Sequence, residues 1–277
     1  MGDATNPVPD GPIEIEGQLT TASNATFLGR IGDTRVVYKP TAGEKPLWDF
    51  PDHTLAQREV ASYLVSEALG WDIVPQTWLS DGPFGPGMVQ RWCDTEPGHD
   101  AVDPVDPVDP VDPVDPVDIV GIAELPARLT AGWLRVLDAV DELDRPVSLI
   151  HEDSTALRRM AVFDIIVNNA DRKGGHVLPM ASGHRHGVDH GLTFHTDDRL
   201  RTVLWGWVGE PLQDAELTAV SELQHALSPG AELYRQLSGL LSDTEVNMCA
   251  RRCEDLVKTA HFPVPHGMMP AVPWPVF

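Results

Sequence analysis

The stretch from Phe163 to Leu178 reads FDIIVNNADRKGGHVL, and residues 187–192 follow it with GVDHGL. An apolar segment with helical spacing leads into a polar loop that contains Asp171, and a short apolar run leaves that loop. A second aspartate, Asp189, stands before a glycine turn, eighteen residues after the first. This order predicts a helix, an acidic loop, a strand and an acidic turn that serve one site.

Two charged residues nearer the N-terminus complete the pattern. Lys39 ends a predicted strand, and Glu59 lies in the only predicted helix of the first half, residues 55–69. The resulting order is Lys, Glu, Asp-x-Lys-x-x-ligand and Asp-x-Gly. Phosphoryl transfer from ATP requires a cation on the phosphates, a carboxylate that holds this cation, an acid/base beside the acceptor hydroxyl, and ligands for Mg²⁺. The sequence offers each of these parts.

The order and spacing resemble the protein-kinase-like superfamily, above all its atypical branch, the phosphatidylinositol 3- and 4-kinases and the HipA-type kinases. Asp171-Arg172 with a ligand five residues after the aspartate is similar to the D-R-H-x-x-N loop of the lipid kinases, and Asn169-x-Asp171 resembles the N-x-D of HipA-type kinases. Further segments resemble an actinobacterial phosphatidylinositol 3-/4-kinase-like family, namely residues 23–28, 158–164, 168–176 and Pro-Trp-Pro at 273–275. The resemblance implies a two-lobed α+β fold with a small antiparallel β N-lobe and a mainly helical C-lobe.

The resemblance also implies how ATP is bound. Lys39 contacts the α- and β-phosphates, and Glu59 pairs with Lys39. A hairpin around Ser23 and Asn24 covers the phosphates with backbone N–H groups and short polar side chains. The adenine edge is met between the lobes by main-chain groups of Val89, Gln90, Arg91 and Trp92.

The residues expected to act on the acceptor and to bind the metal lie in the second half of the chain. The resemblance implies that Asp171 orients or deprotonates the acceptor, that Lys173 faces the transferred phosphoryl group, and that His176 and Asp189 bind Mg²⁺ or Mn²⁺. His176 departs from the pattern, because the resembling families have Asn or another oxygen ligand there and imidazole is softer than Mg²⁺ prefers. We therefore expect a preference for Mn²⁺ or weak activity with Mg²⁺. In the Asp-x-Gly turn, His190 stands where Phe is common in the resembling families. A conformational switch based on packing of that aromatic ring is therefore in doubt.

Three alternatives to γ-phosphate transfer stay open. A pseudokinase or regulatory protein would bind nucleotide and transfer nothing, which His176 alone supports. Transfer of the nucleotide itself is a second alternative. A zinc hydrolase is the third, and its candidate ligands are His176, His184, His186, His190 and His195 with Asp189. A zinc hydrolase leaves Asp171-Arg172-Lys173 without a role, so a kinase-like phosphotransferase is favoured.

Acidic residues dominate the charge, with 42 Asp and Glu against 20 Lys and Arg and a net charge of −22. Six of the aspartates, from Asp103 to Asp118, belong to a VDP repeat in which proline at every third position predicts an extended spacer. Such acidity argues against non-specific binding of nucleic acid or anionic membranes. A protein or small-molecule hydroxyl is therefore favoured over a phosphoinositide as acceptor.

Residues 1–12 are polar, and no apolar stretch of 18 residues occurs, so neither a secretion signal nor a membrane span is expected. The three cysteines are an odd number, so a reduced, cytoplasmic protein is expected. We also expect a monomer without stable membrane association. The expected organisation is a disordered N-terminus (1–12), an N-lobe (13–92), a VDP-repeat insertion (93–118) and a C-lobe with a Pro-rich docking tail (119–277).

The periodicity predicts the individual elements. Strands are expected at 13–17, 25–31, 34–39, 73–79 and 87–92, with short strands within 177–194. Helices are expected at 55–69, 132–143, 154–168, 214–226 and 231–259. The last residues, 262–277, hold five prolines and cannot form a helix, and Trp274 and Phe277 are expected to dock on the body.

Overall fold

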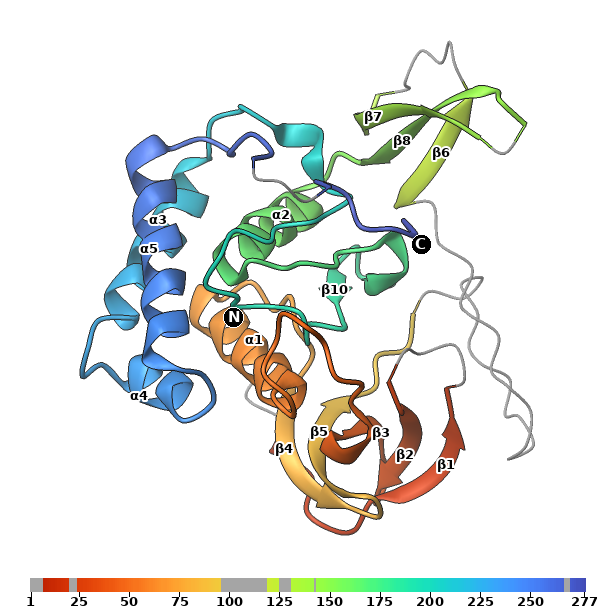
Figure 1. The fold of residues 1–277 in the computed structure, drawn as a ribbon, viewed down its shortest axis with the longest axis vertical. Coiled ribbons are helices and arrows are strands. Elements are labelled where there is room, and N and C mark those ends of the chain that lie inside the picture. The colour runs from red at the N-terminus through yellow and green to blue at the C-terminus, as the bar shows by residue number, and fades with distance from the viewer. Residues whose placement is uncertain (1–6, 20–23, 96–118, 125–130, 142, 267–269) are drawn as a thin grey trace.

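The computed structural model describes residues 7–19, 24–95, 119–124, 131–141, 143–266 and 270–277. Within these residues the chain forms a small β-sheet lobe and a larger, mainly helical lobe, with helix α1 (Leu55–Leu69) between them (Figure 1). The two-lobed α+β architecture predicted from the sequence is confirmed. The VDP repeat and residues 1–6 lie outside the described residues.

Five antiparallel strands form the N-lobe sheet in the order β1-β2-β3-β5-β4. They are β1 (Glu14–Gln18), β2 (Phe27–Ile31), β3 (Thr34–Pro40), β4 (Thr77–Gly82) and β5 (Gly85–Arg91). Gly32, with φ of +57°, makes the predicted turn between β2 and β3. Val36 and Tyr38 of β3 are buried in the N-lobe core with Val89. Because side chains alternate along a strand, Lys39 leaves β3 on the opposite face from Tyr38.

Helix α1 has the bounds that the periodicity predicts, and it packs against both lobes. Val60 contacts Met88 of β5, whereas Val65 and Leu69 belong to the C-lobe core. Gly70 ends the helix in the left-handed conformation, with φ of +64°. The helix that carries Glu59 therefore bridges the N-lobe sheet and the C-lobe.

The helices of the C-lobe are α2 (Thr155–Val167), α3 (Asp214–Ala226), α4 (Glu232–Ser238) and α5 (Asp243–Thr259). Between α2 and α3 lies the short hairpin of β9 (Val177–Pro179) and β10 (Arg185–Gly187). The prediction of one helical stretch over 231–259 is wrong, because Gly239 ends α4 and Ser242 starts α5 with a capping box to Glu245. Of the helices that the structure describes, none combines the length and apolar character that a membrane span requires.

A second antiparallel sheet precedes α2, with the order β6-β8-β7. Its strands are β6 (Val120–Glu124), β7 (Trp133–Val140) and β8 (Pro146–Glu152). The predicted helix at 132–143 is therefore wrong. Over so short a run, apolar spacing does not distinguish a helix from a strand. Pairing with β8, whose Val147 and Leu149 are buried, favours the strand.

The tail follows the C-lobe surface without forming a helix in its described residues. The backbone N–H of Gly174 donates to the carbonyl oxygen of Val276 at 2.9 Å, and Phe277 lies against Gly174. Val272 and Val276 pack on the C-lobe core. Trp274 is 82% exposed, so the expectation that it docks is wrong. In this tail the small valines, rather than the indole of Trp274, pack on the core.

Candidate functional site

Lys39 contacts two carboxylates that come from different parts of the fold. Its Nζ lies 2.7 Å from Oε1 of Glu59 on α1 and 2.8 Å from Oδ1 of Asp189 in the loop after β10. The other carboxylate oxygen of Glu59 accepts the backbone N–H of His190 at 2.9 Å. Strand β3, helix α1 and the acidic turn therefore meet at one point, as the order of residues in the sequence predicts.

Within this cluster, Lys39 and Asp189 are both charged at neutral pH. Burial lowers the pKa of Lys39, but the carboxylates of Asp189 and Glu59 together outweigh burial and raise that pKa above its ordinary value. The Lys39 ammonium holds the pKa of Asp189 well below its usual range, against the opposing effect of burial. The site thus presents an ammonium and an ionised carboxylate, the charges that a metal–polyphosphate complex requires.

His176 faces Asp189 from the end of the Asp171 loop. Its Nε2 lies 3.5 Å from Oδ2 of Asp189, and its Nδ1 lies 2.9 Å from the carbonyl oxygen of Asp171. A carbonyl oxygen only accepts, so Nδ1 carries the proton and the lone pair on Nε2 is free. Burial lowers the pKa of His176, which favours the neutral ring.

The spacing of these two side chains suits a shared ion. Ligand atoms in neighbouring positions of an octahedral Mg²⁺ or Mn²⁺ site lie about 3 Å apart, slightly closer than Nε2 of His176 and Oδ2 of Asp189. Metal-binding histidines usually donate their second N–H to a carbonyl or carboxylate, as His176 does. The residues present therefore fit a divalent cation.

Asp171 and Lys173 lie next to His176 in the same loop. Oδ2 of Asp171 is 3.2 Å from Nζ of Lys173, and each side chain is about one-fifth exposed. The backbone N–H of Asp171 donates to Oδ1 of Asn169 at 3.0 Å, which fixes the loop just after α2. A carboxylate and an ammonium thus lie together in this loop. The backbone carbonyl of Asp171 contacts His176, the possible metal ligand.

A buried ion pair holds the loop from Asp171 to His176 against α2. It is the main feature of the site that was not predicted from the sequence. The guanidinium of Arg172 lies 2.9 Å from Asp164 of α2, and both side chains are fully buried. Arg172 also donates to the carbonyl oxygen of His176 at 3.1 Å and to Nε2 of His190 at 2.7 Å. A charged Asp164 within the apolar face of α2 is the sequence signal for such a partner.

Arg58 fixes α1 to the C-lobe. It donates to the carbonyl oxygen of Thr193 at 2.6 Å and forms an ion pair with Glu245 at the start of α5. One turn along α1, the hydroxyl groups of Ser62 and Thr193 lie 3.3 Å apart. The C-lobe therefore sets the position of Glu59, and the sequence gives no local sign of this, because Arg58 reads as an exposed helix residue.

The residues predicted to cover the phosphates are not seen at the cluster. Ser23 lies outside the described residues. Oδ1 of Asn24 accepts the backbone N–H of Lys45 at 2.9 Å, which holds two N-lobe loops together. The prediction that this hairpin covers the phosphates stays a prediction.

The predicted adenine contacts lie at the end of β5, namely Val89, Gln90, Arg91 and Trp92. Strand β5 is central in the sheet, so its backbone groups pair with β3 and β4. Beyond this, the N–H of Arg91 donates to the carbonyl oxygen of Gln76 and that of Trp92 to the carbonyl oxygen of Arg35. The N–H groups of Arg91 and Trp92 are therefore already engaged, and the prediction that main-chain groups here meet the adenine stays a prediction.

The histidines proposed for a zinc hydrolase are spread over four surroundings. His176 belongs to the cluster above, whereas His190 is fully buried against Arg172 and the ring of Phe163. His195 packs beside Phe50 in an edge-to-face contact. Among the described residues, only His184 and His186 come together, and they do so with Asp72, not with Asp189. The arrangement gives the hydrolase hypothesis no single centre.

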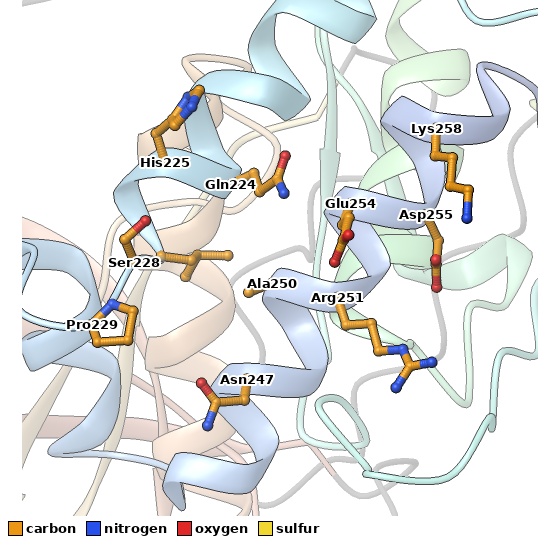
Figure 2. A pocket seen from close by; sticks show the side chains of 11 residues that line it. Gln224, His225, Ser228, Pro229, Asn247, Ala250, Arg251, Glu254, Asp255 and Lys258 are labelled. Carbon is orange, nitrogen blue, oxygen red and sulfur yellow. The ribbon is translucent and has the colours of Figure 1, made fainter.

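A cavity of about 490 Å³ opens on a different face of the C-lobe, between α3 and α5 (Figure 2). Its polar lining includes Gln224 and His225 from α3 and Arg251 and Lys258 from α5. None of the residues predicted for ATP, acceptor or metal lines it. The cavity is therefore separate from the candidate site.

Comparison with known proteins gives one clear relative. No protein-family model matches the chain. Among solved structures, the Helicobacter pylori proinflammatory kinase CtkA is similar with a TM-score of 0.41 and 10% identity, over 90% of this chain and 97% of that one, which is too weak to argue from. Protein Rv2133c of Mycobacterium tuberculosis is 47% identical over 273 residues, which span 97% of this chain and 93% of the relative. This chain belongs to the same family as Rv2133c.

Proposed function

We propose that this protein is a kinase-like phosphotransferase that moves the γ-phosphate of ATP to a hydroxyl acceptor. The supporting observation is the convergence of five residues predicted in fixed order. The side chains of Lys39, Glu59, His176 and Asp189 meet, and Asp171 joins them through its backbone carbonyl oxygen. Single charged residues are common on protein surfaces, but an ammonium between two carboxyl groups, with a neutral imidazole beside one of them, offers the parts of a metal–nucleotide site.

In the proposed reaction, Lys39 binds the α- and β-phosphates while Glu59 holds its ammonium in place. His176 and Asp189 would hold Mg²⁺ or Mn²⁺, which would supply positive charge to offset that of the phosphates. Asp171 accepts the proton of the acceptor hydroxyl as the acceptor oxygen–phosphorus bond forms and the bond between the γ-phosphorus and the bridging oxygen breaks, releasing ADP. Lys173 offsets charge on the transferred phosphoryl oxygens.

The acceptor we favour is a hydroxyl of a protein or small molecule. A phosphoinositide in a bilayer needs an exposed basic rim. Three arginines that stand beside a second basic residue in the sequence are instead buried, namely Arg158, Arg172 and Arg252. With three free cysteines as well, we place the activity in the reducing cytoplasm.

Substitution of Asp171 by Asn tests the proposal. The amide cannot accept the hydroxyl proton, so single-turnover transfer from labelled ATP is expected to slow by about 10²- to 10⁴-fold. Asp33→Asn, in the exposed turn between β2 and β3, is the control and is expected to match the unchanged protein. Equal label transfer by the Asp171 variant and the unchanged protein would mean that Asp171 is not catalytic. ATP binding without transfer would identify a pseudokinase.

His176 is expected to determine the choice of metal. Because imidazole favours Mn²⁺ over Mg²⁺, the unchanged protein should turn over ATP faster with Mn²⁺, and His176→Asn should shift the preference toward Mg²⁺ by supplying an amide oxygen. The measurement is the ratio of turnover rates in the two metals for each protein. Equal rates in both metals, unaltered by the substitution, would contradict this role.

A further inference from the structure

Three possible metal ligands meet away from the proposed nucleotide site. Asp72 lies in the segment that follows α1, while His184 and His186 belong to the hairpin that follows the Asp171 loop. Each of the three side chains has one possible metal-ligating atom that lies within 4.8 Å of those of the other two. His184 and His186 are two residues apart, so they share one face of the hairpin strand.

Backbone hydrogen bonds orient both imidazoles. Nδ1 of His186 lies 3.3 Å from the carbonyl oxygen of Ile73, and Nε2 of His184 lies 2.7 Å from that of Asp72. Since carbonyl oxygens only accept, each of these nitrogens carries its proton, and the other nitrogen of each ring keeps a free lone pair. Metal-binding histidines are held in this way by a second hydrogen bond.

The backbone of the segment after α1 is itself fixed. Oγ of Ser66 accepts the N–H of Ile73 at 2.8 Å and that of Val74 at 3.0 Å, while the N–H of Gly187 donates to the carbonyl oxygen of Ile73 at 2.7 Å. The rings of His184 and His186 meet edge to face, with centroids 4.5 Å apart. The fold therefore positions the backbone that carries the three possible metal ligands.

Asp72 supplies a carboxylate beside the two imidazoles. Its side chain is 71% exposed, and its Oδ2 lies 4.0 Å from Nε2 of His184, too far for a hydrogen bond. Two imidazoles with one carboxylate are a ligand set typical of Zn²⁺, whereas Mg²⁺ prefers oxygen ligands alone. We propose that Asp72, His184 and His186 bind a Zn²⁺ ion whose remaining position is taken by water.

This site is independent of the proposed phosphoryl transfer, because it uses none of the residues assigned to it. Its effect is on the fold: the ion would link the end of α1 to the hairpin between Asp171 and Asp189. Bound Zn²⁺ stabilises the folded state in proportion to its occupancy, provided the unfolded chain binds it less well.

Calorimetric titration of Zn²⁺ into the chelator-treated full chain at pH 7.5 tests the proposal. One high-affinity site is expected in the unchanged protein, because the His176–Asp189 pair offers Zn²⁺ fewer protein ligands than Asp72, His184 and His186 together. His184→Ala, His186→Ala and Asp72→Asn should each weaken it by at least about tenfold, since each removes a ligand. His225→Ala, on the exposed face of α3, is the matched control and should bind as the unchanged protein does.

A fourth variant separates the two sites. His176→Ala should retain the Zn²⁺ affinity, whereas loss of binding in this variant alone would place the ion at the proposed nucleotide site and overturn the proposal. Absence of binding by the unchanged protein, or equal affinity in the Asp72, His184 and His186 variants, would also overturn it. Because exposed Asp72 makes no strong contact through its side chain, circular dichroism of Asp72→Asn checks that a weaker affinity does not reflect misfolding.

Discussion

Replacement of Asp189 by Asn is expected to lower phosphoryl transfer from ATP by about 10³-fold or more, while the protein stays folded. The carboxylate has two roles in the site: one oxygen contacts Lys39 at 2.8 Å, and the other faces Nε2 of His176 at 3.5 Å. An amide has no charge to neutralise the metal, and its nitrogen would oppose the Lys39 ammonium. Both the metal and the position of Lys39 are therefore affected by one substitution.

The fold should tolerate this substitution because the Asp189 side chain is about half exposed, and ion pairs near solvent contribute little to stability. Lys39 keeps its contact with buried Glu59. The measurements are the single-turnover rate and the melting temperature, with Asp198→Asn on the exposed C-lobe surface as the control. If the rate of the Asp189 variant fell by less than tenfold, Asp189 would not be a metal ligand of the reaction.

Replacement of Arg172 by Met is expected to have the largest effect on stability, about 3–5 kcal/mol in the free energy of unfolding. Arg172 and Asp164 are both fully buried, so loss of the guanidinium leaves an uncompensated carboxylate inside the C-lobe. His190 would lose the donor that meets its Nε2 at 2.7 Å. At about 2–4 °C per kcal/mol, the melting temperature should fall by about 6–20 °C.

Urea unfolding of matched variants measures this effect. Arg235→Ala breaks an exposed ion pair with Glu232 on α4, and it should change the free energy of unfolding by less than about 1 kcal/mol. The double variant Arg172→Met/Asp164→Leu should lose less stability than the sum of the two single changes, because it leaves no buried charge alone. Equal, small losses for Arg172→Met and Arg235→Ala would contradict the importance of the buried pair.

Local patterns predicted much of the fold, because their signals lie in neighbouring residues. Helix α1 ends at Gly70, and α3 has the predicted bounds of 214 and 226. The turn at Gly32 likewise follows from two adjacent residues. Strand β7 was not predicted because its identity depends on pairing with β8, and the indole of Trp274 turns outward for reasons of tail geometry that composition does not contain.

The residues of the candidate site were likewise predicted only in part. Lys39, Glu59, Asp171, His176 and Asp189 were identified from residue types in order and from the family resemblance, and the structure brings them into contact. The residues that position them were not identified. Arg58 acts through partners far along the chain, which one sequence does not reveal. For Arg172 the one sequence signal is the charged Asp164 within the apolar face of α2, which indicates a buried partner without identifying it.

The contacts of Arg58 have a consequence for how the molecule opens. Helix α1 is covalently part of the first lobe, but its ion pair with Glu245 and its packing in the larger core make it part of the C-lobe's cooperative unit. Local opening of the small N-lobe sheet should therefore leave α1 protected from hydrogen exchange. The contact between Lys39 and Glu59 then marks the boundary between two units of unequal stability, and a ligand held by Lys39 would join them.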